Sequence, residues 1–303
     1  MHIREIQYVL TIVEEGNITN AAKKLFMAQS SLSQSLKKTE QQLECKLFKR
    51  IGNRLQLTYA GEQFVKSGSR IIKIYRDMKN EMSDISQIKS GNIIIGITYY
   101  LGSHMFPIFG PAFKKRYPGV SIKLMEGTSR DLEKLIASGQ VDIAILPHPI
   151  ENSSIEYETL FLSRMILLMN KDNPLNNQGY RKDGFRFPHI DIKLVDGEPF
   201  LMGQPGQRIR LINEIIFEKA NINPVIVFTS RNLETIKRMA SKGAGLAIIP
   251  DNYLDYIQAS TDLRCYYLEE EYDYQFGVVA AYQKNSYITK ATREFLSIVK
   301  QLF

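Results

Sequence analysis

A face rich in serine, glutamine and lysine is predicted between residues 29 and 43. Apolar Leu32, Leu36 and Leu43 recur at the spacing of a buried helical side, so the polar residues occupy the opposite side. Glutamine and serine can exchange hydrogen bonds with base edges in the major groove, and lysine can neutralise phosphate. Taken alone, this helix fits a solvated amphipathic surface equally well. The candidate base and phosphate contacts are Gln29, Ser30, Ser31, Ser33, Gln34, Lys37 and Lys38.

Two arginines follow this helix in a segment that is typical of a β-hairpin. Leu55 and Leu57 alternate after the turn-forming pair Gly52-Asn53, which predicts a small two-stranded wing. Arg50 and Arg54 would lie at the base and the tip of the wing, where they can contact phosphate or a minor groove. Both arginines therefore join the candidate DNA contacts.

Hydroxyl, tyrosine and glycine residues follow several predicted strands in the rest of the chain. Where parallel strands end, ligands bind near the amino termini of the next helices, and hydroxyls there suit a small anion such as a carboxylate. Tyr99 and Tyr100 would equally suit a less polar molecule. Thr128 and Ser129 have a simpler explanation as helix N-caps. The candidate ligand contacts are Thr98, Tyr99, Tyr100, Ser103, Thr128, Ser129, Met202, Gly203 and Gln204.

No grouping of residues indicates catalysis. The sequence contains no Gly-x-Ser-x-Gly, no Walker loop and no His-Glu-x-x-His. Cys45 and Cys265 are far apart, which predicts no disulfide, and the four histidines suggest no metal site. The apolar runs are too short to cross a membrane, and the amino terminus does not have the apolar core of a secretory signal. These features predict a cytoplasmic protein that is not an enzyme and has no cofactor.

The positive charge is concentrated at one end of the chain. The 303 residues have a net charge of +7. Residues 1–90 contain 15 Lys and Arg against 9 Asp and Glu, whereas the remaining residues contain 24 against 23. A basic amino-terminal module on a nearly neutral body indicates that one end meets a polyanion.

Three short helices are expected to position the polar face. A helical stripe covers residues 3–13. Thr19 is expected to cap a second helix over residues 20–26, and Ser30 or Ser31 is expected to cap the third. A short helix, a tight turn and a polar helix in this order form a helix-turn-helix.

A long helix is predicted from about Tyr59 to Gln87, with Thr58 as its cap. Its apolar residues follow a heptad spacing, whereas its basic residues, including Lys73 and Arg76, are expected to stay in solvent. A narrow apolar seam favours a partner helix, so we expect a homodimer whose two recognition helices read an inverted repeat. Packing of this helix on its own domain is the alternative. The seam comprises Phe64, Ile71, Tyr75, Met78, Met82 and Ile85, with Gly68 as a weak layer.

Strand and helix patterns alternate beyond a hinge at residues 89–92. The first half is expected to contain strands at 93–97, 121–125 and 141–146, with helices at 102–116 and 130–138. The second half repeats this order, with strands at 199–202, 225–228 and 246–249 and helices at 209–220 and 233–241. Such alternation implies parallel sheets covered by helices. Two α/β lobes with a cleft between them are expected, and the unusually long segment 176–189 receives no role.

The amino-terminal residues resemble the DNA-binding domain of the LysR-type transcriptional regulators. The matching residues are Asn20-Ala21-Ala22-Lys23-Lys24-Leu25, Gln29, Leu32-Ser33, Leu36, Glu40, Leu43, Leu47-Phe48-Lys49-Arg50, Leu57-Thr58 and Ala60-Gly61-Glu62. The body resembles the effector domain of the same family through Phe106-Pro107, Phe113, Tyr117-Pro118-Gly119-Val120, Leu132, residues 139–145, Glu198-Pro199-Phe200 and residues 243–250. Ala28, Ser30, Thr39 and Glu44 depart from the usual residues of the family, which leaves the base preference open but not DNA binding.

The resemblance implies a winged helix-turn-helix, a linker helix and a two-lobed α/β domain similar to periplasmic binding proteins. It also implies that Thr98, Tyr100, Thr128 and residues 202–204 contact an effector, and that the usual assembly is a homotetramer.

These observations lead us to expect a sequence-specific regulator that binds double-stranded promoter DNA and responds to a small-molecule effector. Residues 1–60 would form the winged helix-turn-helix, 61–90 the linker helix and 91–303 the effector-binding domain. One lobe would comprise about 91–165 and 268–303, and the other about 166–267. The alternative is a small-molecule binding protein, or an enzyme, on a two-lobed fold without specific DNA recognition.

Overall fold

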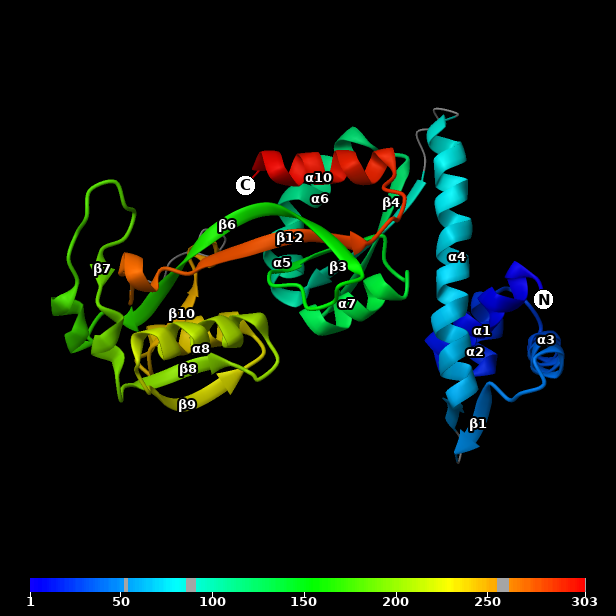
Figure 1. Ribbon diagram of the computed structural model, residues 1–303, viewed down its shortest axis with the longest axis horizontal. Coiled ribbons are helices and arrows are strands. Elements are labelled where there is room, and N and C mark those ends of the chain that lie inside the picture. Colours follow the sequence, from blue (N-terminus) through cyan, green and yellow to red (C-terminus); the bar gives the residue numbers. More distant parts are fainter. Residues whose placement is uncertain (52–53, 86–90, 255–261, 303) are drawn as a thin grey trace.

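The computed structural model describes the chain except for residues 52–53, 86–90, 255–261 and 303. Three helices form its amino-terminal end: α1 (Ile3–Glu15), α2 (Ile18–Lys24) and α3 (Gln29–Gln42) (Figure 1). Their apolar sides enclose a small core, in which Ala21 and Leu32 are fully buried. Because alanine is small, α2 can approach its neighbours closely. The order and packing of the three helices confirm the predicted helix-turn-helix.

The limits of α2 differ from the predicted ones. Asn17 caps this helix, rather than Thr19, because the Asn17 side-chain oxygen accepts a hydrogen bond from the backbone N–H of Asn20 at 2.7 Å. The helix ends before Leu25, and Phe26 adopts a left-handed conformation with a φ of 52°. Phe26 therefore belongs to the turn and not to the second helix.

The limits of α3 also correct the prediction. The helix begins at Gln29, after an Ala28 N-cap that makes no side-chain hydrogen bond. Ser30 and Ser31 consequently lie in the first turn and do not cap it. Leu43 was expected to point inward, but the helix ends there and the side chain is exposed.

The predicted wing is present as a two-stranded antiparallel sheet. Its strands are β1 (Phe48–Ile51) and β2 (Arg54–Leu57). The predicted turn at Gly52-Asn53 lies outside the described residues. Thr58 caps the next helix as predicted, since its Oγ1 accepts a hydrogen bond from the backbone N–H of Gly61 at 3.0 Å.

That helix, α4 (Tyr59–Ile85), lies between the amino-terminal helices and the body (Figure 1). The expectation that its basic residues stay in solvent is wrong for Lys73, which is 3% exposed. Its alkyl stem packs on Gly139 of the body, and its ammonium pairs with Asp77 at 2.5 Å. A long aliphatic stem allows a lysine to be buried in this way when its charge has a partner.

The first lobe contains a sheet in the order β4-β3-β5-β12-β6, with β3, β4 and β5 parallel as predicted. Its strands are β3 (Gly91–Thr98), β4 (Val120–Gly127), β5 (Ile143–Pro147) and β12 (Gln275–Gln283), of which β12 is antiparallel to β5. Its helices are α5 (Tyr99–His104), α6 (Phe106–Arg116), α7 (Ser129–Ala137) and α10 (Lys290–Leu302).

The single helix predicted over residues 102–116 is two helices. α5 begins directly after β3, and the chain changes direction at Met105 before α6. Pro107 lies in the first turn of α6, where a residue without a backbone N–H is tolerated. The break therefore falls where the proline would interrupt a continuous helix.

The strand β6 (Ile155–Asn170), which the sequence did not predict, connects the two lobes. Its first part pairs with β12 as far as Arg164, and from Met165 onward it pairs with β10 (Ala247–Pro250) and β11 (Leu263–Leu268). Figure 1 shows β6 and β12 side by side between the two lobes. The lobes thus share one continuous strand.

The second lobe contains a parallel pair of strands, β8 (Pro199–Gly203) and β9 (Val225–Ser230), with α8 (Arg208–Ala220) and α9 (Leu233–Ser241). The α/β order is as predicted: Leu246 forms a parallel bridge with Phe200 of β8, and β10, which follows directly, pairs antiparallel with β6 on its other side. Within the described ranges, no helix is long and apolar enough to cross a membrane.

The segment between β6 and β8 has its own short elements. These are the 3-10 helix η1 (Pro174–Gln178), β7 (His189–Ile190) and the 3-10 helix η2 (Ile192–Val195). Tyr180 and His189 form an antiparallel bridge, and β7 pairs in parallel with β11. Residues 180–189, which we name the strap, therefore close on themselves at the end of the sheet. Two further 3-10 helices are η3 (Asp251–Tyr253) and η4 (Glu270–Tyr272).

Candidate nucleic-acid interface and inter-lobe cleft

The predicted recognition face of α3 is presented to solvent. Its exposed residues are Gln29, Ser30, Ser31, Gln34, Lys37 and Lys38, and Ser33 is half-buried. Leu32 and Leu36 are buried on the opposite side. The Lys38 ammonium lies 3.9 Å from Glu5 of α1, which draws it toward the protein surface. The remaining residues form a continuous donor- and acceptor-bearing face.

Glu40 attaches α3 to the wing and was missed as a functional residue. It is 7% exposed, and its Oε1 accepts hydrogen bonds from the backbone N–H groups of Leu47 at 2.9 Å and Phe48 at 3.4 Å. Its Oε2 pairs with the Lys46 ammonium at 2.7 Å. The carboxylate therefore satisfies backbone donors where the wing begins. A lone acidic residue in a helix rich in Ser, Gln and Lys was the available signal.

The wing and the turn add two more side chains near α3. Arg50 is exposed on β1. Arg54 begins β2, and its side chain is not described. Phe26, to which sequence analysis assigned no role, is 97% exposed in the turn that precedes α3. This ring lies at the amino-terminal end of the polar face of α3.

The predicted seam on α4 divides into two parts. Phe64 packs against the core of the amino-terminal helices, and a Cβ at Gly68 would lie 2.9 Å from the Ile6 side chain. These two positions pack on the helix-turn-helix of the same chain, which is the alternative stated for this helix. The second part is exposed: Ile71, Met78 and Met82 are 41%, 50% and 54% exposed.

Ile74, which was not in the predicted seam, is 69% exposed on this same side of α4. The predicted Tyr75 is half-buried, with the Lys79 ammonium 4.8 Å from its ring centroid. Tyr75 therefore contributes less than Ile74 to the apolar surface. The side chain of Ile85 is outside the described part of the chain. We name Ile71, Ile74, Met78 and Met82 the exposed apolar face of α4.

A small cleft lies between the two lobes, with a volume of about 80 Å³. Of the predicted ligand contacts it is lined by Thr98, Tyr99, Tyr100, Thr128 and Ser129. These residues follow β3 and β4, so the carboxyl ends of neighbouring parallel strands bring them together as the sequence pattern implies.

A stacked pair of tyrosines fills much of this cleft. The rings of Tyr100 and Tyr253 are parallel with centroids 3.4 Å apart, and the Tyr100 hydroxyl donates to the Tyr253 carbonyl at 3.3 Å. Burial raises the pKa of the Tyr253 hydroxyl. The volume accessible to a ligand therefore depends on where the Tyr100 ring lies.

Ser103 and the predicted contacts on β8 do not reach the cleft. The Ser103 side chain is exposed and donates a hydrogen bond to the Tyr99 carbonyl at 2.8 Å, one turn back on α5. Met202 and Gly203 are buried in the second lobe, because β8 runs through its core. Gln204 is at the rim, where its side-chain oxygen accepts a hydrogen bond from Arg231 at 2.9 Å.

Two arginines at the cleft were missed by sequence reasoning. Arg208 and Arg231 line it from the start of α8 and the loop before α9. Arg208 is 7% exposed and connects the lobes: it pairs with Glu133 of α7 at 2.7 Å and with Glu151 of the first lobe. Arg208 begins α8 and Arg231 precedes α9, and this position at the start of two predicted helices was the available signal.

Two carboxyl groups near the cleft have a pKa below the ordinary value. The Arg208 hydrogen bond keeps the pKa of Glu151 below its ordinary value. Thr128 caps α7, because its Oγ1 accepts from the Asp131 backbone N–H at 3.3 Å, and it donates to the Asp131 carboxylate at 2.6 Å. That hydrogen bond lowers the pKa of Asp131. The simpler explanation of Thr128 as an N-cap therefore holds alongside its position in the cleft.

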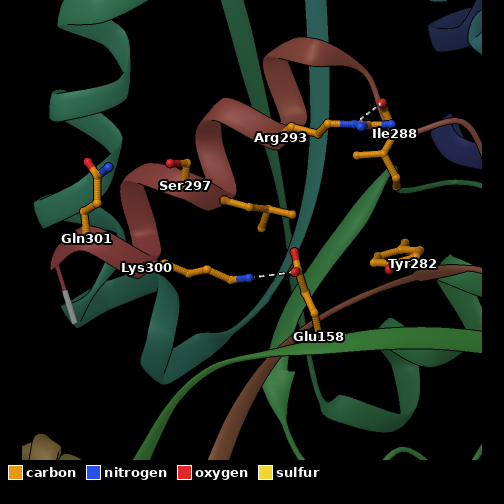
Figure 2. Close-up of a pocket in the computed structure, with 8 residues that line it drawn as sticks. Glu158, Tyr282, Ile288, Arg293, Ser297, Lys300 and Gln301 are labelled. Carbon is orange, nitrogen blue, oxygen red and sulfur yellow. Dashed lines mark hydrogen bonds and ion pairs between the residues drawn. The ribbon is translucent and has the colours of Figure 1, made fainter.

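A second hollow lies between α10 and the sheet of the first lobe (Figure 2). Lys300 and Glu158 pair across it at 2.7 Å, and Arg293 donates to the Ile288 carbonyl at 3.3 Å. Its charged groups already have partners, so we assign it no ligand. No group of three or more His, Cys, Asp or Glu side chains among the described residues could hold a metal ion.

Two models of one family of bacterial regulators match most of the chain. Residues 3–62 match the bacterial regulatory helix-turn-helix protein family of lysR type, and residues 86–303 match the LysR substrate binding domain. The chain belongs to the LysR family. It is a DNA-binding transcriptional regulator with an effector-binding domain, and its relatives are regulators and not enzymes.

The chain is similar to named relatives and to solved structures over nearly its full length. The uncharacterized regulator YcgK of Bacillus subtilis (strain 168) is 27% identical over 99% of this chain and 94% of its own length. The regulator BsdA of the same strain is 27% identical over 98% of this chain and all of its own length. A full-length OxyR variant from Pseudomonas aeruginosa has a TM-score of 0.77 at 20% identity, covering 99% and 94% of the two chains. CbnR, solved with its target DNA, has a TM-score of 0.66 at 17% identity, covering 99% of each chain.

Proposed function

We propose that this protein binds a specific promoter sequence as a homodimer or a higher assembly, and that a small anion between its lobes modulates that binding. The observation that supports DNA reading most directly is the exposed polar face of α3 beside Arg50. Gln29, Ser33 and Gln34 are the proposed base contacts, and Lys37, Arg50 and Arg54 are the proposed phosphate contacts. We further propose the domain limits of 1–60, 61–90 and 91–303, and a cytoplasmic location.

Two arginines that line the cleft favour an anionic effector. Arg231 is exposed at its rim, and Arg208 projects from the first turn of α8. The Arg208 Nε is buried without a hydrogen-bond partner among the described residues, so it can donate to a ligand. Thr98 and Ser129 supply hydroxyls on the other wall. A carboxylate paired with a guanidinium and a hydroxyl would satisfy these donors.

Helix α7 connects the cleft to the linker helix. Thr128 at its start lines the cleft, and Gly139 just beyond its end packs on Lys73 of α4. Next to this contact, Arg76 of α4 pairs with Asp142 at 2.7 Å. A ligand that shifts α7 would therefore move the element that positions both recognition helices. We propose this path for the response to the effector.

Two surfaces suit contact with further copies of the chain. The exposed apolar face of α4 points away from the side that carries Lys73 and Arg76, which favours pairing of two α4 helices. A separate edge strand, β9, exposes four consecutive apolar residues, 225–228, at 40–54%. An unpaired apolar edge strand favours association. We propose that α4 forms the dimer and that β9 joins dimers into a tetramer.

Binding of the full-length protein to the DNA upstream of its own gene tests the proposed function. We expect a shifted complex at low ionic strength, with an affinity that falls steeply as salt rises, because lysines and arginines displace counterions from phosphate. Random duplex of equal length should bind at least about a thousandfold more weakly. Equal affinity for both duplexes would contradict specific recognition.

Replacement of Met78 by glutamate tests the dimer. We expect Met78→Glu to halve the mass of the assembly in sedimentation velocity, because two carboxylates would face each other in an apolar contact of α4 while the contact through β9 is untouched. As a control, Lys79→Glu adds the same carboxylate one residue further, about 100° around the helix. The Lys79→Glu control should keep the mass of the unmodified assembly. A Met78→Glu variant with unchanged mass would rule out the α4 contact.

A further inference from the structure

We infer that the protein has a second ligand site, on the opposite side of the hinge from the inter-lobe cleft. It would take a small molecule that combines an oxyanion, carboxylate or phosphate, with a flat apolar group. The site is a cavity of about 480 Å³ beneath the tip of the strap, which we name the hinge pocket. It is lined by Leu162, Ser163, Arg164, Gly184, Phe185, Arg186, Asp251, Tyr267 and Gln275.

The hinge pocket and the cleft lie on opposite faces of the same chain segments. On β12, Phe276 lines the cleft and its neighbour Gln275 lines the hinge pocket. Near η3, Tyr253 lines the cleft and Asp251 lines the hinge pocket. Adjacent side chains of an extended strand point to opposite faces, which accounts for the separation on β12. A ligand in the hinge pocket would thus contact the strands that join the lobes.

The lining of the hinge pocket carries more positive than negative charge. Arg164 and Arg186 bring two guanidinium groups, and Gln275 brings an exposed amide. The one carboxylate in the lining, that of Asp251, accepts from the Arg164 backbone N–H at 3.3 Å and the Tyr267 hydroxyl at 3.1 Å. An oxyanion would complement the two guanidinium groups.

Arg164 is positioned by aromatic rings more than by its acidic neighbour. Its guanidinium carbon lies 4.8 Å from the Phe185 ring centroid and 5.8 Å from that of Tyr267. Its Nε is 3.6 Å from the Asp273 carboxylate, which is longer than a normal hydrogen bond. A closer oxyanion could therefore compete for this guanidinium. The ring of Phe185, which is half-buried, offers a flat apolar surface beside it.

The strap is closed on itself and is joined to β11 and the residue that follows it. Two backbone hydrogen bonds join Tyr180 and His189, at 2.9 Å and 2.8 Å, and the Tyr180 hydroxyl donates to Glu269 at 2.5 Å. His189 is fully buried, with Phe185 edge-on to its ring at 4.6 Å between centroids. These contacts hold Phe185 over the cavity. The long segment 176–189 thereby gains a role, as one wall of a site.

A single tryptophan can report on this pocket, because the chain contains none. Leu162 lines the pocket and is 58% exposed, so Leu162→Trp places the reporter without opening the core. We expect phenylphosphate and phenylacetate to change the fluorescence of the introduced indole in the full-length protein with millimolar or lower dissociation constants, and inorganic phosphate to bind more weakly. No response to either aromatic anion at about 10 mM would overturn the proposal, and equal binding of inorganic phosphate would overturn its apolar part.

A pair of variants on the strap localises the site. In the Leu162→Trp background, Arg186→Ala should weaken phenylphosphate at least about tenfold, because it removes one guanidinium from the pocket. Arg181→Ala removes an exposed arginine from the same strap outside the pocket lining, and it should leave the affinity unchanged. Equal affinity in the Arg186→Ala variant and its parent would place the ligand elsewhere and overturn the assignment.

Discussion

Replacement of Lys37 by glutamate is expected to reduce operator affinity by about a hundredfold or more. Lys37 is exposed on the recognition face of α3, so the variant removes a phosphate contact and adds a negative charge facing DNA in each subunit. The slope of affinity against salt concentration should also become shallower, by about one unit for each lost phosphate contact. Fluorescence anisotropy with labelled operator at several salt concentrations measures both quantities.

Lys115→Glu is the matched control for this experiment. Lys115 is exposed on α6 in the body, far along the chain from the helix-turn-helix, and the substitution makes the same change of charge. It should leave operator affinity and salt slope close to those of the unmodified protein. If both variants weakened binding equally, net charge rather than a contact by α3 would explain the loss.

Replacement of Arg208 by alanine is expected to destabilise the effector-binding domain by about 3–5 kcal/mol. The variant leaves the Glu133 carboxylate, which is 5% exposed, without its partner across the lobes. For a domain of this size we expect the melting temperature to fall by about 10 °C. Thermal unfolding followed by circular dichroism measures this change.

Two further variants separate loss of the ion pair from a general effect of removing arginine. Arg238→Ala removes a surface ion pair with Glu234, in which the Arg238 side chain is 77% exposed. This variant should lower the free energy of unfolding by less than about 1 kcal/mol. The double variant Arg208→Met with Glu133→Leu removes both buried charges and should recover most of the stability. A double variant as unstable as Arg208→Ala would show that the cost is not the uncompensated Glu133 charge.

Much of the fold could be predicted from local sequence patterns. The helices α1, α3, α4, α8 and α9 and the strands β3, β4 and β5 have strong periodicity, and their existence was predicted with shifts of a few residues at their ends. Helix α10 was also missed, and the missed strands β6, β11 and β12 pair between residues far apart in the sequence, as in the register of Gln275 with Arg164. Such pairing depends on tertiary contacts that a window of neighbouring residues does not contain.

The candidate sites were predictable to different degrees. The DNA-facing residues share one helix, so their spacing alone placed Gln29, Gln34 and Lys37 on one face. The cleft is assembled from both lobes, and only the contribution of Thr98 and its neighbours at strand ends could be anticipated. Arg208 was missed because its partner Glu133 lies 75 positions earlier in the chain. The pairing of charges that meet across a domain has no signature in the neighbouring residues.

The continuity of β6 limits how this regulator can be recombined. Its sixteen residues form a strand of the sheet in both lobes, so a chain divided anywhere inside β6 would leave each fragment without a complete central strand. Exchange of one lobe alone between relatives would meet the same obstacle at Arg164 and Met165. Chimeric regulators with a new effector specificity should therefore be made by transplanting the complete effector-binding domain, or by substituting side chains around an intact β6.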